Sequence, residues 1–248
     1  MLKILVNGAN GKMGNAVCNL ILEKKGIEVV AMVDKNYDTE GNKKFNTISD
    51  VTSFFDVIID FSIPEGAMEC VNYALKNNKA IVISTTGLSN EQLDYIYQAS
   101  KNIPIFMSKN MSFGANLLVD LATKVAKLLY EEADIEIIEK HHNQKIDAPS
   151  GTAIMISDSV KQVLDDKMYN VYDRTHSRNK RDKKEIGILS VRGGTIVGEH
   201  EVIFACNDET FTISHSAMSR NVFAEGAIKA AKFIVSKKSG IYSMKNLM

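Results

Sequence analysis

The feature that most constrains the fold is a glycine-rich loop between a short strand and a helix near the start of the chain. Residues 3–7 form an apolar run that ends at Asn7 and predicts a buried strand. The loop over residues 8–14 reads Gly-Ala-Asn-Gly-Lys-Met-Gly, and apolar residues at helical spacing continue from it to Lys25-Gly26. This order is typical of a dinucleotide site, where pyrophosphate lies on free N–H groups at the start of a helix.

The spacing G-x-x-G-x-x-G departs from the commoner G-x-G-x-x-G, so the residues around the loop matter. A second β-branched run, 28–33, ends at Asp34, about 20 residues after Gly14, where an acid that binds ribose belongs. Lys35 follows and could accept the extra phosphate of NADP, although a solvated loop lysine is an equal alternative. A glycine-rich turn in an unrelated α/β protein remains possible, but the combination favours a site for NADH or NADPH.

Strands and helices alternate through the first half of the chain. Further apolar runs at 56–61, 80–83 and 104–107 predict strands. One helix is expected to begin at Pro64, and another at Ser89, where Gln92 gives the capping-box spacing. This alternation predicts an α/β fold with a Rossmann-type, doubly wound parallel sheet covered by helices on both faces.

The pattern changes after Phe113. Helices are expected at 114–130 and 152–164, and strands at 135–139, 186–192, 195–206 and 210–215. Gly193-Gly194 and residues 207–209 predict hairpins, hence an α+β unit with a mainly antiparallel sheet. An Ala-rich helix at 222–235 could return to the first unit. We expect a dinucleotide-binding domain over 1–112, completed by a C-terminal helix within 221–248, and a substrate-binding and oligomerisation domain over 113–220.

A second cluster of reactive side chains lies at residues 139–152. His141 and His142 are adjacent, and Lys145 follows four residues after the first histidine. Imidazole is the natural proton donor or acceptor near neutral pH. Ser150-Gly151-Thr152 begins a helix, whose hydroxyls and free N–H groups could bind a carboxylate. An exposed histidine pair is the plainer alternative, and without a His-Glu-x-x-His motif or a nearby cysteine no metal is expected.

Composition narrows the partners and the compartment. The chain has 30 Lys+Arg and 30 Asp+Glu, so no global field favours nucleic acid or an anionic membrane. The basic segment 174–184 lacks interleaved aromatic residues, and we interpret it as a solvated loop. Three cysteines, odd in number and far apart, exclude a disulfide framework and indicate a reducing cytoplasm.

The motifs together resemble those of the 4-hydroxy-tetrahydrodipicolinate (dihydrodipicolinate) reductase family of diaminopimelate and lysine biosynthesis. The resemblance rests on residues 8–14, on Thr85-Thr86-Gly87 and above all on residues 139–153, which read EKHHNQKIDAPSGTA. It continues through Val197-Gly198-Glu199-His200, Ser219-Arg220 and residues 223–227, and so runs the length of the chain. It implies NAD(P)H-dependent reduction of a small dicarboxylate by a homotetramer.

The resemblance also implies roles for individual residues. His141 and Lys145 would transfer protons, and His142, Ser150, Gly151 and Thr152 would bind the substrate carboxylates. The cofactor-binding residues would be Gly8, Ala9, Asn10, Gly11, Lys12, Met13, Asp34, Lys35, Ser84, Thr85, Thr86, Ser108, Lys109, Asn110 and Met111. Two other functions remain open from the residues alone: another two-domain nicotinamide dehydrogenase acting on an amino acid or semialdehyde, and a non-catalytic NAD(P)-sensing regulator.

Overall fold

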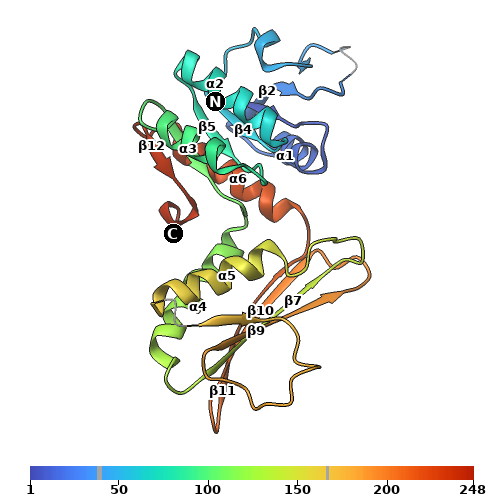
Figure 1. The fold of residues 1–248 in the computed structure, drawn as a ribbon. Coiled ribbons are helices and arrows are strands. Elements are labelled where there is room, and N and C mark those ends of the chain that lie inside the picture. The colour runs from blue at the N-terminus through green and yellow to red at the C-terminus, as the bar shows by residue number, and fades with distance from the viewer. Residues whose placement is uncertain (38–40, 166–167) are drawn as a thin grey trace. The chain divides into compact units, whose positions relative to one another are not determined.

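The computed structural model describes residues 1–37, 41–165 and 168–248 (Figure 1). The chain divides into two compact units, of which the first comprises Met1–Phe113 with Arg220–Met248 and the second comprises Gly114–Ser219. Within the described ranges, no helix is both long enough and apolar enough to cross a membrane.

The first unit is built on a seven-stranded sheet with the order β12-β6-β5-β4-β1-β2-β3, and every pairing in it is parallel. Its strands are β1 Leu2–Asn7, β2 Ile27–Val33, β3 Lys44–Phe45, β4 Val57–Asp60, β5 Ala80–Ile83, β6 Pro104–Met107 and β12 Gly240–Tyr242. The residues of β4 and β5 are all buried, as expected for strands covered on both faces.

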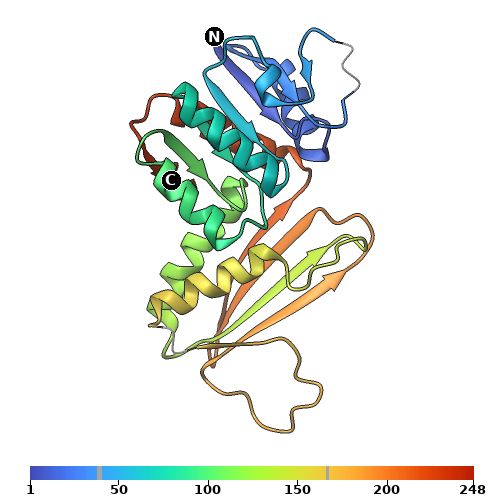
Figure 2. The same cartoon turned by 45° about the horizontal axis from the view of Figure 1, so that its top comes forward.

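Helices cover both faces of this sheet (Figures 1 and 2). They are α1 Lys12–Leu22, α2 Pro64–Asn77, α3 Asn90–Ala99 and α6 Asn221–Ile234, with 3₁₀ turns η1 Ile48–Asp50 and η2 Met244–Asn246. One apolar core contains residues of α1 and α6, and the other contains residues of α2 and α3. The expected doubly wound α/β fold is therefore confirmed, and α6 packs on the first unit as the Ala-rich pattern suggested.

The order of strands in this sheet determines where a ligand can bind. From β1 the chain proceeds through β2 to one edge, and from β4 it proceeds through β5 and β6 toward the other. Open α/β sheets bind ligands beside the carboxyl ends of the strands at such a reversal. Asn7 ends β1 and Asp60 ends β4, and the two residues are partners in register.

The second unit has a five-stranded sheet in the order β11-β10-β7-β9-β8, with helices α4 Phe113–Leu129 and α5 Gly151–Val163. The strands are β7 Asp134–His141, β8 Tyr169–Val171, β9 Glu185–Arg192, β10 Gly198–Ala205 and β11 Thr210–Ala217. The core joins α4 and α5 to alternate residues of the sheet, such as Ile135 and Ile137. On the face of the sheet that does not pack against these helices, Leu189 and Val191 of β9 are 48% and 45% exposed.

The sheet of the second unit corrects one part of the sequence prediction. Strand β10 pairs antiparallel with β7 and β11, but β9 pairs parallel with β7 and β8, so the sheet is mixed rather than mainly antiparallel. The hairpin expected across Gly193-Gly194 does not form, because β7 lies between β9 and β10. The glycines instead carry the chain past the end of β7, where Gly193 N donates to His141 O at 2.9 Å.

Candidate functional site

The glycine loop of the first unit is held in a shape that only glycine permits at two positions. Gly8 has φ +71°, and a Cβ there would lie 2.5 Å from Phe61 O. At Gly14 a Cβ would lie 2.2 Å from Gly8 O and 2.5 Å from Ala9 Cα. Both clashes are with backbone atoms, so no side-chain movement relieves them. The first and third glycines of the motif thus make the tight turn and the close helix–strand contact of a dinucleotide loop.

The side chain of Asp34 is hydrogen-bonded to the backbone of this loop. Its Oδ2 accepts from Asn10 N at 3.1 Å, and its Oδ1 accepts from Asn36 N at 3.0 Å. Gly11 precedes α1 as the N-cap and supplies no side-chain cap to the first turn. Lys12 and Lys35 are exposed. The loop, the start of α1 and the acid at the end of β2 therefore come together as the sequence predicts.

The ends of β5 and β6 form a second part of the same unit. A hollow of about 250 Å³ is lined by Thr85, Thr86, Ser108 and Lys109, together with neighbouring apolar residues. Ser84 Oγ is buried and lacks a hydrogen-bond partner among the described residues. Ser108 Oγ donates to Asn110 O at 2.7 Å. Residues from two of the segments that the resemblance assigns to the cofactor thus lie at one hollow.

Met111 differs from the other residues of this set. Its side chain is 2% exposed and belongs to the core that contains α6, and its carbonyl oxygen would lie 1.7 Å from a Cβ at Gly226. The Met111 side chain therefore packs the interior of the first unit. Its neighbours Lys109 and Asn110 are exposed and partly exposed.

One residue that the sequence did not reveal is Asp60, a buried carboxylate at the end of β4. Asp60 is fully buried and accepts hydrogen bonds from Asn7 Nδ2 at 2.8 Å, Ser62 Oγ at 2.5 Å and Thr85 Oγ1 at 2.6 Å. Burial raises the pKa of Asp60, and these hydrogen bonds oppose the rise. Asp60 thereby ties together the carboxyl ends of β1, β4 and β5, which carry the predicted cofactor residues.

In the second unit, His141 ends β7 and lies against a buried acid. The residue is only 9% exposed, and its Nδ1 lies 2.6 Å from Oε2 of the fully buried Glu139. Burial raises the pKa of Glu139, but hydrogen bonds from Arg192, Ser190 and His141 outweigh it and bring the pKa to about 2. Burial lowers the pKa of His141, with Glu139 acting in the opposite direction. A charged carboxylate thus faces the predicted proton-transfer residue.

The start of α5 lies at the same place. Ser150 is its N-cap, and Ser150 Oγ accepts from Ala153 N at 3.2 Å. The same oxygen lies 2.9 Å from His200 Nε2, and the rings of His141 and His200 meet edge to face at 5.2 Å. Burial, reinforced by His141, lowers the pKa of His200 to about 4, so this second histidine is neutral near pH 7. Gly151 is exposed and has open space where a Cβ would stand.

The remaining residues of the histidine segment are more accessible. Lys145 Nζ lies 2.8 Å from Asp147 Oδ1, and its side chain is 21% exposed. The hydrogen bond from Lys145 lowers the pKa of Asp147. His142 and Thr152 are partly exposed. The second unit thus brings His141, Lys145 and the α5 start into one polar cluster with Glu139, Arg192 and His200, which the sequence reading had left without roles.

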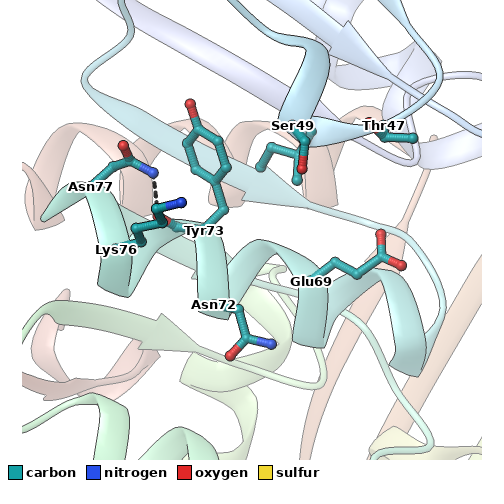
Figure 3. A pocket seen from close by; sticks show the side chains of 8 residues that line it. Thr47, Ser49, Glu69, Asn72, Tyr73, Lys76 and Asn77 are labelled. Atoms are coloured by element: carbon teal, nitrogen blue, oxygen red, sulfur yellow. Dashed lines mark hydrogen bonds between the residues drawn. The ribbon is translucent and has the colours of Figure 1, made fainter.

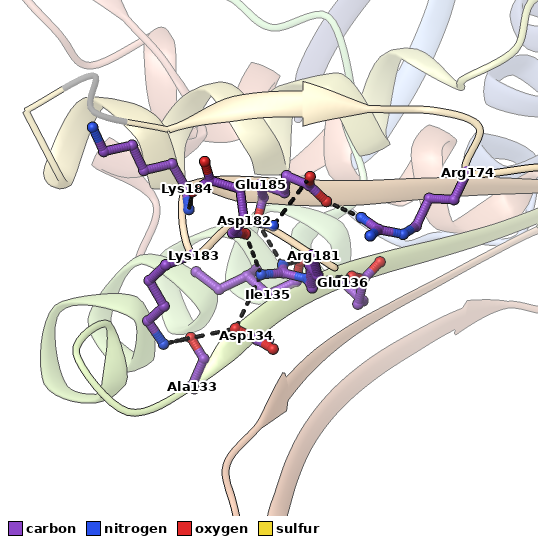
Figure 4. A network of polar contacts seen from close by, with 10 residues as sticks. All are labelled: Ala133, Asp134, Ile135, Glu136, Arg174, Arg181, Asp182, Lys183, Lys184 and Glu185. Carbon is purple, nitrogen blue, oxygen red and sulfur yellow. Dashed lines mark hydrogen bonds and ion pairs between the residues drawn. The ribbon is translucent and has the colours of Figure 1, made fainter. Parts of the chain in front are cut away.

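The basic segment 174–184 is bound to acidic residues of its own unit (Figure 4). Arg181 donates to Asp134 Oδ1 and Glu136 Oε1, both at 3.0 Å, and to the carbonyl oxygens of Ile135 and Glu185. Arg174 pairs with Glu185, and Lys183 Nζ donates to Ala133 O at 2.9 Å. Arg181 and Lys183 anchor the long connection before β9 to the start of β7, and Arg174 pairs with the first residue of β9. The network gives the segment a structural role and leaves fewer cations for a polyanion.

Another hollow, of about 620 Å³, lies on the first unit between η1 and α2 (Figure 3). It is lined by Thr47, Ile48, Ser49, Glu69, Asn72, Tyr73, Lys76 and Asn77. None of the predicted site residues lines it, and Asn77 Nδ2 donates to Tyr73 O within the helix at 2.9 Å. We assign it no ligand.

The first unit fits a dinucleotide on the geometry of its own residues. The contacts at Gly8 and Gly14 leave no room for side chains, and the buried Ser84 Oγ is without a partner. In the ranges that the structure describes, no group of three or more His, Cys, Asp or Glu side chains could hold a metal ion.

Comparison with known proteins agrees with this geometry. The family described as "Dihydrodipicolinate reductase, N-terminus" matches residues 2–111, and "Dihydrodipicolinate reductase, C-terminus" matches residues 114–248. The 4-hydroxy-tetrahydrodipicolinate reductase of Caldanaerobacter subterraneus subsp. tengcongensis is 51% identical over 248 residues, covering 100% of this chain and 98% of the relative. The enzyme of the same name from Clostridium tetani is 44% identical, over 98% of this chain and 96% of the relative.

Comparison with solved structures also finds a member of this family. A dipicolinate-bound dihydrodipicolinate reductase from Paenisporosarcina sp. TG-14 has a TM-score of 0.83 and 26% identity, and each chain is fully covered. A myo-inositol 2-dehydrogenase from Lactobacillus plantarum, at 11% identity, covers 94% of this chain and 88% of its own with a TM-score of 0.60, a likeness of fold alone. The chain belongs to the dihydrodipicolinate reductase family.

Proposed function

We propose that this chain reduces 4-hydroxy-tetrahydrodipicolinate to tetrahydrodipicolinate in diaminopimelate and lysine biosynthesis, with NADH or NADPH as the reductant. The observation that carries the proposal is the Glu139–His141 pair beside the start of α5, in a chain that the family matches over both units. The net reaction adds one hydride and one proton and releases the 4-hydroxyl group as water. The substrate is a small dicarboxylate.

The first unit is proposed to be the dinucleotide-binding domain. Gly8, Ala9, Asn10, Gly11, Lys12 and Met13 would bind the pyrophosphate at the start of α1, and Asp34 would bind a ribose hydroxyl. Ser84, Thr85, Thr86, Ser108, Lys109 and Asn110 would line the nicotinamide side, with Met111 supporting them from the core. When bound, nicotinamide supplies the hydride.

The second unit is proposed to bind the substrate and supply the proton. His142, Ser150, Gly151 and Thr152 would bind the carboxylates, because hydroxyls and helix N–H groups suit anions. His141 and Lys145 would donate protons as negative charge develops on the substrate ring. Lys145 now pairs with Asp147, which is 61% exposed, so this ion pair can exchange for one with substrate.

A coupled assay tests the function directly. Pyruvate and aspartate semialdehyde are condensed enzymatically to the substrate, this protein is added, and oxidation of NADH and NADPH is followed by absorbance. We expect oxidation that depends on both the condensation product and this protein. Oxidation of neither cofactor would refute the proposal. Turnover with aspartate or homoserine in place of the condensation product would instead favour another nicotinamide dehydrogenase.

Lys35 is expected to bind the 2′-phosphate of NADPH. The residue is exposed and follows Asp34, which is attached to the glycine loop. Lys35→Ala should therefore weaken binding of NADPH about tenfold while changing that of NADH little. Fluorescence titration with each cofactor measures the two Kd values, and Lys25→Ala is a matched control on the loop after α1. An equal loss for both cofactors would remove the phosphate role.

We also propose a cytoplasmic homotetramer that assembles through the second unit. Cys18, Cys70 and Cys206 are free thiols, which suits a reducing compartment. Leu189 and Val191 are exposed on the sheet and offer apolar area for subunit contact. Light scattering should give the mass of four 27.5 kDa chains, and Leu189→Glu with Val191→Glu should reduce it. A monomeric wild-type mass would contradict the proposal.

A further inference from the structure

We propose that Glu139 and Arg192 are a positioning pair that fixes the tautomer of His141, keeping a proton on Nδ1 so that Nε2 is the atom that exchanges protons with substrate. This inference rests on the proposed function, since it takes His141 as the proton-transfer residue. It assigns roles to two residues that do not themselves need to contact the substrate.

Each carboxylate oxygen of Glu139 already has two polar partners. Its Oε2 accepts from Arg192 Nη1 at 2.8 Å and lies 2.6 Å from His141 Nδ1. Its Oε1 accepts from Arg192 Nη2 at 2.7 Å and from Ser150 N at 3.1 Å. A carboxylate without a proton can only accept, so the short contact requires a proton on His141 Nδ1. The neutral imidazole is therefore the Nδ1–H tautomer.

Arg192 holds this carboxylate in one orientation. The pair is bidentate, and such parallel N–H···O bonds fix the plane of both groups. Arg192 Nη2 also donates to Asp147 O at 2.7 Å, which links the end of β9 to the loop that carries Lys145. His141 and Arg192 are partners in register on β7 and β9. The same guanidinium thus positions the acid behind His141 and the segment that carries the second proton donor.

Nε2 of His141 is left available by the neighbouring strand. A Cβ at Gly198, the first residue of β10, would lie 3.0 Å from Nε2, so a side chain there would crowd this atom. In the part of the chain that the structure describes, Nδ1 makes a hydrogen bond and Nε2 makes none. The proton on Nδ1 is held by the protein, and the reactive position is the opposite nitrogen.

The charges around His141 give the direction of the expected pH effect. The pKa of His141 is lowered by burial, while Glu139 on its own strand raises it and Lys145 on the following loop and Arg192 on β9 lower it. His200 on β10 faces its ring and has its own pKa lowered to about 4, so it carries no charge near neutral pH. Replacing Glu139 by glutamine removes the negative charge and lowers the pKa of His141 further. Because the protonated imidazole is the proton donor, the loss of activity that accompanies rising pH should begin at a lower pH than in the wild type.

The test uses Glu139→Gln in the full-length protein. We expect kcat to fall about 100-fold with an unchanged Kd for NADH, and the alkaline limb of the kcat–pH profile to move to lower pH. Glu139→Gln combined with His141→Gln should be no slower than His141→Gln alone, because the acid acts through the histidine. Asp158→Asn, which removes an exposed partner of Lys161, is the control and should leave the profile unchanged.

A second readout does not depend on turnover. Long-range ¹H–¹⁵N spectra distinguish the two tautomers of each of the five histidines, and His141→Gln assigns the His141 signals. The wild type should show the Nδ1–H form, and Glu139→Gln should shift the population toward Nε2–H. If Glu139→Gln does not fold, Arg192→Lys, which keeps the charge but loses the bidentate geometry, should produce a tautomer mixture and a kcat about tenfold lower.

Two outcomes would overturn the inference. The first is that a folded Glu139→Gln has the wild-type tautomer and an unshifted pH profile. If Glu139→Gln does not fold, the same result in a folded Arg192→Lys would count equally. The other is a wild type that carries its proton on Nε2. Failure of the proposed function would look different, because the wild type would then oxidise neither NADH nor NADPH with the condensation product, whatever the tautomer of His141.

Discussion

His141→Gln is expected to lower kcat by about 10² to 10⁴ while leaving the Kd for NADH unchanged. The imidazole is nearly buried, and its Nδ1 faces a carboxylate that is charged at neutral pH. Glutamine can keep a hydrogen bond to Glu139, but it cannot deliver a proton. The loss should therefore appear in the chemical step rather than in cofactor binding, which is proposed to occur on the first unit. Steady-state kinetics and NADH titration together measure both quantities.

Lys145→Ala should produce the same separation of kcat from cofactor binding. Its ammonium group is proposed to supply a proton and to lie near the negative charge that develops on the substrate. Lys161→Ala removes another lysine of the second unit that is paired with an aspartate, and it should leave kcat unchanged. Near-normal turnover of either His141→Gln or Lys145→Ala would show that the replaced residue does not supply the proton.

Much of the first unit could be predicted because its signals are local. The capping box at the start of α3 forms as expected, with Gln92 N donating to Ser89 Oγ at 3.2 Å and Ser89 N donating to Gln92 Oε1 at 2.9 Å. Pro64 is the first residue of α2, as proline's fixed φ favours. The apolar runs of β1 and β4 are the buried centre of the sheet. In each case a few adjacent residues determine the structure.

The elements that were missed depend on pairing with distant residues. Strands β3, β8 and β12 have only two or three residues each, too few for an alternating pattern to be recognised. The C-terminal strand β12 exists because Ile241 pairs with Ile105 of β6. Likewise, Gly193-Gly194 marks a change of direction, but it does not say which strand will lie beside β9. Tertiary pairing decided the order of the mixed sheet.

The candidate site divides in the same way. Residues within one motif, from His141 to Thr152, could be assigned together because they share a loop and a helix start. Arg192 lies about fifty residues from Glu139 in sequence, and their contact depends on the parallel pairing of β7 with β9. One signal was available: Glu139 is two residues before His141, so strand alternation places both side chains on the same face. Asp60 offered no comparable signal, because its partner Asn7 ends β1 and its partner Thr85 follows β5, both far from Asp60 in sequence.

Gly14→Ala is expected to abolish measurable NADH and NADPH binding and to lower the free energy of unfolding by about 1–3 kcal/mol. The added Cβ would stand 2.2 Å from Gly8 O and 2.5 Å from Ala9 Cα, so the start of α1 must move away from the loop. That movement separates the N–H groups of the helix from the turn that is proposed to hold the pyrophosphate. Fluorescence titration and chemical denaturation measure the two effects.

A graded series shows whether the effect comes from this contact. At Gly11 a Cβ would lie 3.2 Å from Gly8 O, so Gly11→Ala should weaken cofactor binding less than Gly14→Ala does. Gly193→Ala places its methyl group in open space and should change neither binding nor stability. Because the clash at Gly14 lies within the first unit, the His141 tautomer should remain that of the wild type. Wild-type cofactor affinity in Gly14→Ala would mean that the dinucleotide binds away from the glycine loop.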